Sequence, residues 1–121
     1  MQRERFEATE IAWLAGVFEG EGSFRSNKNT VNGKLYYYPQ MTVRMTDEDI
    51  IAKMAAMFGV KYHQFENGHR VDGTPGLPIY VTSIQGKRAV AFMKAVLPYM
   101  GIRRSLKINE ILLEYSNRLP A

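Results

Sequence analysis

Two carboxylates stand close together in the segment from Leu14 to Gly22, whose sequence is LAGVFEGEG: Glu19 and Glu21. The spacing of the apolar residues predicts a helix from Thr9 to Gly20, which puts Glu21 at the C-terminal end of that helix. The helix dipole disfavours a negative charge there, so the carboxylate needs a positive partner. A hard, oxygen-bound divalent cation such as Mg²⁺ is a suitable partner, and we predict that Glu21 binds one.

The predicted helix has two faces that need burial. Ile11, Leu14 and Phe18 form an apolar stripe at spacings of three and four residues. A second stripe consists mostly of small side chains, and its members are Ala12, Ala15, Gly16, Glu19 and Gly20. Because Gly16 and Gly20 carry no side chain, another helix can approach this stripe backbone to backbone. One small domain supplies one core, so the second stripe predicts a partner helix.

The rest of the chain predicts the same order of elements twice: strand, strand, helix. Asn32-Gly33 is a strong signal for a tight hairpin turn, Thr9 and Thr46 are candidate helix caps, and Gly59 is a candidate helix stop. The expected elements are a helix over 9–20, strands over 23–30 and 35–45, a helix over 46–59, strands over 60–66 and 77–84, and helices over 86–97 and 103–117. This order predicts an α+β domain.

The composition limits the class of protein. The chain has 121 residues, no cysteine and a formal net charge of +4, and 45% of its residues are hydrophobic. Those values predict one folded domain and exclude disulfides and thiolate metal sites. No apolar run approaches the length that crosses a bilayer, and residues 1–10 contain no secretion signal. We therefore expect an intracellular protein of the cytoplasm, the nucleoid or an organelle matrix.

Basic residues gather in two stretches that contain no acid, residues 22–46 and 73–109. Their members are Arg25, Lys28, Lys34 and Arg44 in the first stretch, and Lys87, Arg88, Lys94, Arg103, Arg104 and Lys107 in the second. Such stretches predict a surface that faces phosphate groups. A basic face that is merely solvated explains the charge equally well.

The segment LAGVFEGEG resembles the LAGLIDADG signature of homing endonucleases. Leu14, Ala15 and Gly16 are identical to its first three letters, and Glu19 and Glu21 take the places of its two acids. The larger block WLAGVFEGEGSF is similar to the form common in intron-encoded members, and the predicted order of elements matches the αββαββα core of the family. The resemblance covers nearly all of the chain. The alternative is an ordinary amphipathic helix whose acids are solvated.

The resemblance implies one domain over residues 1–121 with the αββαββα fold, in which a four-stranded antiparallel sheet forms a saddle and a C-terminal helix follows. It implies a homodimer, because the single motif must pair with the same helix of a second subunit. It also implies Mg²⁺-dependent cleavage of both strands of a long, near-palindromic DNA target, without a small-molecule cofactor and without a membrane. One acid per subunit does not fill a metal coordination sphere, so the Gly20 carbonyl, waters and DNA phosphates would complete it.

In the family the concave face of the sheet lies in the DNA major groove, so the resemblance implies that alternate strand residues contact DNA. The expected DNA-binding residues are Ser23, Arg25, Asn27, Lys28, Gln40, Thr42, Arg44, Lys61, His63 and Arg104, with Tyr80 and Thr82 as further candidates. Arg103 occupies a place where the family often has a basic residue near the scissile phosphate. Its implied catalytic role is to stabilise charge in the transition state. An arginine that binds backbone phosphate or solvent is an equally good interpretation.

Two other classes of function stay open at this point. One keeps the fold without the cleavage: a DNA-binding regulator, or a maturase that assists splicing of intron RNA. The retained acid at Glu21 argues against it, because a non-cleaving descendant has no need of a carboxylate in that place. The other class is a dimeric α+β protein that binds a small molecule, and it predicts no salt-dependent binding to DNA.

Overall fold

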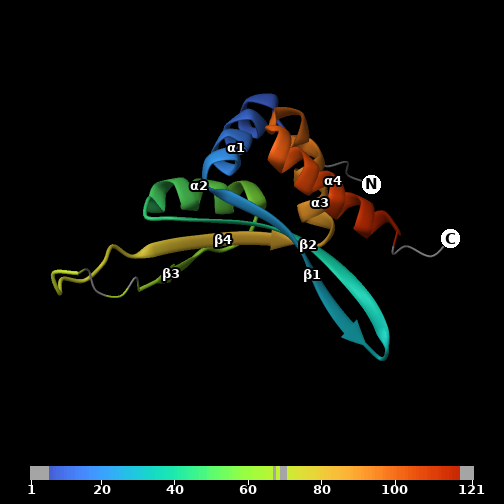
Figure 1. Ribbon diagram of the computed structural model, residues 1–121. Coiled ribbons are helices and arrows are strands. Elements are labelled where there is room, and N and C mark those ends of the chain that lie inside the picture. The colour runs from blue at the N-terminus through green and yellow to red at the C-terminus, as the bar shows by residue number, and fades with distance from the viewer. Residues whose placement is uncertain (1–5, 67, 69–70, 118–121) are drawn as a thin grey trace.

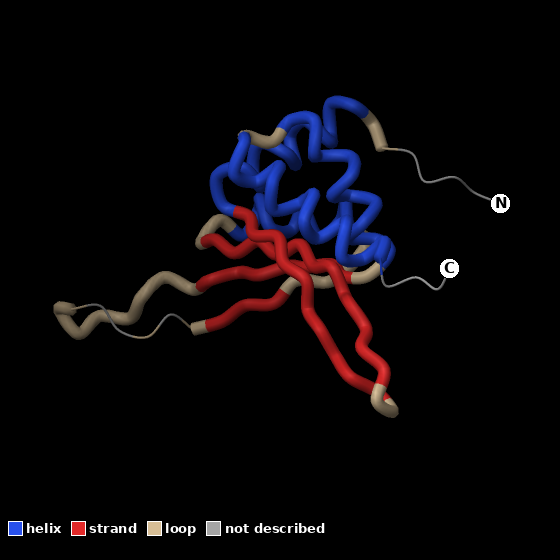
Figure 2. Tube along the Cα trace, turned by 45° about the vertical axis from the view of Figure 1, so that its right-hand side comes forward, coloured by secondary structure: helices blue, strands red, loops and turns tan. Residues whose placement is uncertain are grey.

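Four α-helices cover one face of a four-stranded antiparallel sheet in the described part of the chain, as Figures 1 and 2 show. The structure is a computed structural model that describes residues 6–66, 68 and 71–117. Its elements are α1 (Ala8–Glu21), β1 (Gly22–Val31), β2 (Lys34–Met45), α2 (Glu48–Phe58), β3 (His63–Phe65), β4 (Ile79–Gln85), α3 (Lys87–Val96), the 3-10 helix η1 (Leu97–Tyr99) and α4 (Ile102–Asn117). The predicted fold class is confirmed.

The strands follow the order β1-β2-β4-β3, and every neighbouring pair is antiparallel. Asn32 and Gly33 form the predicted hairpin turn between β1 and β2, with φ values of 53° and 78° that an Asn-Gly pair tolerates well. The strand predicted over 60–66 is shorter than expected, because only three of its residues, His63–Phe65, pair with β4.

Two predicted helix caps are wrong. α1 begins at Ala8, where the Glu7 carbonyl accepts the first helical bond from the Ile11 N–H at 2.9 Å, so Thr9 lies inside the helix. α2 begins after Asp47, not Thr46, and no side chain caps it. Gly59 does end α2, in the left-handed conformation (φ 74°) that favours glycine.

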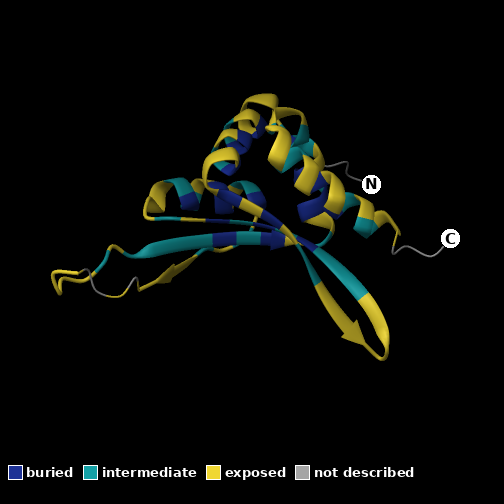
Figure 3. Ribbon diagram, in the orientation of Figure 1, coloured by how far each residue is buried: buried dark blue, intermediate teal, exposed yellow. Residues whose placement is uncertain are grey.

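The core lies between the sheet and the helices, and Figure 3 shows buried residues where the two layers meet. Phe18 of α1 is fully buried at its centre, with its ring 5.4 Å from that of Phe24 and 6.1 Å from that of Phe58. Ala15, predicted to face a partner helix, is instead only 1% exposed in this core. On α1 its direction lies between the apolar stripe and the small-residue stripe, and in this fold it belongs to the core. Within the described residues no helix is long and apolar enough to span a membrane.

Candidate active site and nucleic-acid interface

The sheet face that carries no helices is lined mainly by polar side chains, and we call it the open face. The strand register shows which residues belong to the open face, because directly paired residues project to the same side of a sheet. Phe24, Met41 and Ile84 pair across the strands on the helix-covered side, so their sequence neighbours project away from the core. The open face includes Ser23, Arg25, Asn27, Tyr38, Gln40, Thr42, Arg44, His63, Phe65, Ile79, Val81, Ser83 and Gln85.

A hydrogen-bonded cluster lies at the middle of the open face. Arg25 pairs directly with Gln40 across β1 and β2. Its Nε donates to Oε1 of Gln40 at 3.0 Å, and Nδ2 of Asn27 donates to the same oxygen at 2.8 Å. The remaining N–H groups of Arg25 and the amide nitrogen of Gln40 stay available as donors. Donors of this kind match the major-groove edge of purines.

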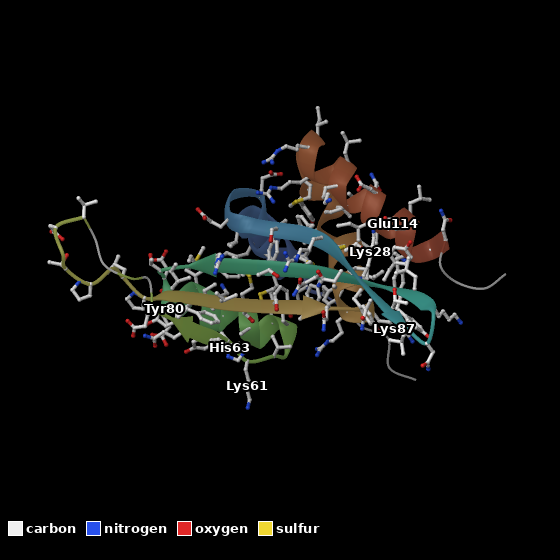
Figure 4. All side chains as sticks on the ribbon, turned by 60° about the horizontal axis from the view of Figure 1, so that its bottom comes forward. Lys28, Lys61, His63, Tyr80, Lys87 and Glu114 are labelled. Carbon is white, nitrogen blue, oxygen red and sulfur yellow. The ribbon has the colours of Figure 1, made fainter. Side chains whose placement is uncertain are left out.

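Lys28 lies on the other side of the sheet, contrary to the prediction. Lys28 is four residues after Phe24 on β1, so its side chain projects to the same side of the sheet as that of Phe24. Its Nζ is 3.5 Å from Oε2 of Glu114 on α4, and both side chains are labelled in Figure 4. The same ammonium lies 5.7 Å from the ring centroid of Tyr37. These contacts tie the hairpin to α4 and turn Lys28 away from the open face.

The remaining candidates lie near the β3–β4 pair, and only some of them project onto the open face. His63 lies on the open face opposite Val81, whereas Lys61 precedes β3 and is exposed outside the sheet (Figure 4). Tyr80 and Thr82 project to the helix-covered side and not, as expected, to the open face: Thr82 is 1% exposed and donates to the Lys61 carbonyl at 3.0 Å. Desolvation by burial, followed by the Glu48 carboxylate, raises the pKa of Tyr80 above its ordinary value.

Several open-face residues were not predicted from the sequence: Tyr38, Phe65, Ile79, Val81, Ser83 and Gln85. The sequence of β4, IYVTSIQ, has apolar and hydroxyl residues at both parities, so alternation does not identify its core side. The one sequence signal in β4 was Gln85, an amide side chain of the same type as Gln40, with which it pairs on the open face.

Glu21 and Arg103 both present free side chains beside the start of β1. Glu21 ends α1, is exposed, and makes no ion pair or hydrogen bond within the described residues. Arg103 lies in the first turn of α4 and is likewise exposed and unpaired within that part of the chain. An open groove of about 540 Å³ runs between these elements, lined by Gly22, Ser23, Phe24, Arg103, Arg104, Leu106, Lys107 and Glu110. Arg103 therefore shares this groove with Gly22, the residue that directly follows Glu21 in the chain.

Arg104 does not face outward, contrary to its prediction as a DNA-binding residue. Its side chain is only 15% exposed, and its guanidinium donates to the Gly22 carbonyl at 2.6 Å. Its Nε lies 3.1 Å from Oε2 of Glu19, close enough for an ion pair although outside hydrogen-bond geometry. Oε1 of Glu19 accepts the N–H of Gly101 at 2.5 Å. Glu19, predicted to contact a second subunit, is thus bonded within its own chain.

The small-residue stripe of α1 is narrower than predicted. Ala12, Gly16 and Gly20 are exposed, and a Cβ atom added at either glycine would meet nothing within 4 Å. Ala15 and Glu19 are engaged inside the chain, as described above. The surface that is open to a partner helix consists of the three remaining small residues.

A cation at Glu21 would need ligands from outside this chain. No three His, Cys, Asp or Glu side chains come together anywhere in the described ranges 6–66, 68 and 71–117. Glu21 offers one hard, unpaired carboxylate, and the Gly20 carbonyl precedes it in the chain. This donor chemistry fits Mg²⁺, but only in a site that other molecules complete.

Comparisons with known proteins agree with the geometry. No protein-family model matches the sequence, and no curated protein matches it. Among solved structures, the homing endonuclease I-CvuI in complex with its target superposes with a TM-score of 0.60 at 18% identity, over 92% of this chain and 66% of that one. The group I intron-encoded homing endonuclease I-CeuI, complexed with DNA, gives 0.58 at 16% identity, over 96% of this chain and 59% of that one.

This chain spans less than two thirds of the length of either protein. Another match is described as a LAGLIDADG meganuclease, I-CpaMI, bound to uncleaved DNA, with a TM-score of 0.50. The resemblance inferred from residues 14–22 is confirmed for the architecture: the chain has the LAGLIDADG homing endonuclease fold.

Proposed function

We propose that this protein is a site-specific DNA endonuclease that acts as a homodimer and requires a divalent cation. The observation that carries the proposal is the position of the unpaired Glu21 carboxylate at one end of a polar, helix-free sheet face. On this fold, that face has the shape and hydrogen-bonding groups to lie in a DNA major groove. Structures of I-CvuI, which has the same fold, are described with DNA in the presence of Ca or of Mg.

In the proposed reaction each subunit cleaves one strand of a near-palindromic target. Glu21 would hold Mg²⁺, with the Gly20 carbonyl, waters and DNA phosphates as the other ligands, and the cation supplies a Lewis acid for phosphodiester hydrolysis. Arg103 would contact the phosphate that gains charge in the transition state. The Arg25, Asn27 and Gln40 cluster would contact bases and fix the position of the duplex.

Removal of the arginine on the open face tests the proposed DNA surface. We expect Arg25→Ala to weaken binding to a selected target by about 1–3 kcal/mol, roughly five- to hundredfold in dissociation constant. Lys28→Ala is the matched control, because it removes one positive charge from the same strand on the opposite side of the sheet. Fluorescence anisotropy in Ca²⁺ measures both. Equal losses from the two variants would contradict the assignment of the open face.

Obstruction of the small-residue stripe tests the proposed homodimer. Gly16→Leu adds a branched side chain where the chain itself leaves open space, so we expect the monomer to fold and the dimer to dissociate. Ala56→Leu places the same side chain on the exposed side of α2 and should leave the dimer intact. Sedimentation equilibrium gives the mass of each variant. A Gly16→Leu protein that remains dimeric would exclude this stripe as the interface.

A further inference from the structure

The two acids of the LAGVFEGEG segment have different surroundings. The Glu21 carboxylate is free, whereas both oxygens of Glu19 are occupied: Oε1 by the Gly101 N–H at 2.5 Å and Oε2 by the guanidinium of Arg104, whose Nε is 3.1 Å away. Gly101 directly precedes α4, and its carbonyl accepts the first helical bond from the Ser105 N–H. Glu19 therefore bonds the N-terminal end of α4, where the helix dipole favours a negative charge.

Arg104 extends this connection back to the chain beside Glu21. Its guanidinium donates to the carbonyl of Gly22 at 2.6 Å, and this hydrogen bond joins two residues that are 82 positions apart in the sequence. With a side chain only 15% exposed, Arg104 is partly desolvated. A charge in that setting strongly favours keeping its ionic partner. The Glu19–Arg104 pair is thus a fixed link between the last turn of α1 and the first turn of α4.

The link joins the immediate neighbours of the two proposed catalytic residues. Gly22 follows Glu21, and Arg104 follows Arg103, so the same hydrogen bond limits how far the two peptide segments move apart. A change of about 1 Å in such a distance can lower a reaction rate by about a hundredfold. Within the described residues, no hydrogen bond or ion pair holds the side chain of Glu21 or of Arg103 in place.

We propose that Glu19 and Arg104 are positioning residues, which set the distance between Glu21 and Arg103 without contacting metal or DNA. This inference rests on the proposed endonuclease function. It assigns the first acid of the segment to a link within the subunit, and leaves the second acid to the cation.

The test compares Glu19→Gln and Arg104→Gln with the unchanged protein. The amide at position 19 still accepts the Gly101 N–H but loses its charge attraction to Arg104. We expect single-turnover cleavage with Mg²⁺ to fall about tenfold to a hundredfold in each variant. We expect the dissociation constant for the same DNA in Ca²⁺ to change less than about threefold, since neither residue lies on the open face. In the double variant the two losses should not multiply, because both substitutions break one link.

Glu114→Gln is the matched control, because it removes a different ion pair of α4, the one with Lys28 on β1. That control should cleave at the rate of the unchanged protein. If the Glu19 and Arg104 variants cleave normally, or lose activity only in proportion to their folded fraction in a denaturation curve, the positioning role is overturned while the endonuclease function stands. If the unchanged protein cuts no duplex from a randomised library, both proposals are overturned.

Discussion

Replacement of Glu21 by Gln is expected to abolish DNA cleavage while leaving DNA binding intact. The amide is a poorer ligand than a carboxylate for a hard cation, and the substitution removes the free carboxylate that ends α1. Since the cation contributes several kcal/mol to transition-state stabilisation, the rate should fall by at least about a hundredfold. Single-turnover cleavage of a target selected from a randomised duplex library, with Mg²⁺, measures the effect.

Glu10→Gln is the control for the charge change, since Glu10 is an exposed acid in the first turn of the same helix. It should cleave normally. Binding in Ca²⁺ separates the roles further: a Glu21→Gln protein with unchanged affinity has lost chemistry, not recognition. Cleavage at the normal rate by that variant would place the cation elsewhere and remove Glu21 from the mechanism.

Substitution of Gly22 by Ala is expected to destabilise the fold by about 1–3 kcal/mol or more. The backbone at Gly22 passes directly over Phe18, and an added Cβ would lie 2.8 Å from the Phe18 Cα and closer still to its ring. Phe18 is fully buried and packed against other rings, so it has no room to move aside. The free energy of unfolding from urea titration measures the loss.

Gly20→Ala provides the matched comparison two residues earlier. An added Cβ there meets nothing within 4 Å, and alanine favours a helix by as much as about 1 kcal/mol over glycine. At concentrations where the chain is monomeric, Gly20→Ala should therefore be as stable as the unchanged protein or more so. Equal destabilisation by the two substitutions would show that the contact with Phe18 is not the cause.

Local patterns were sufficient for most of the fold. The turn at Asn32-Gly33 fixes the pairing of β1 with β2, and the strict alternation around Phe24 and Met41 assigns the sides of both strands correctly. Lys28 shares the parity of Phe24, so alternation itself placed it on the helix-covered side, where α4 provides a carboxylate. In β4 the alternation is absent, and the side of Thr82 follows only from its pairing with Val43.

The candidate site was only partly predictable for a different reason. Glu21 was singled out by the resemblance of residues 14–22 to a known signature, together with the conflict between a carboxylate and the helix C-terminus. The contact between Glu19 and Arg104 breaks no local rule, and each residue looks like an ordinary surface charge in its own helix. Their proximity depends on how α1 and α4 pack, which no spacing within either segment encodes.

The ion pair between Arg104 and Glu19 also limits which parts of this protein can be exchanged. Chimaeras that transplant α1 from another protein of this fold, without an acid at position 19, would strand a nearly buried guanidinium beside the Gly22 carbonyl. A transplanted α4 without an arginine at position 104 would leave Glu19 with half of its partners. The last turn of α1 and the first turn of α4 therefore form one unit for recombination, although most of the chain separates them.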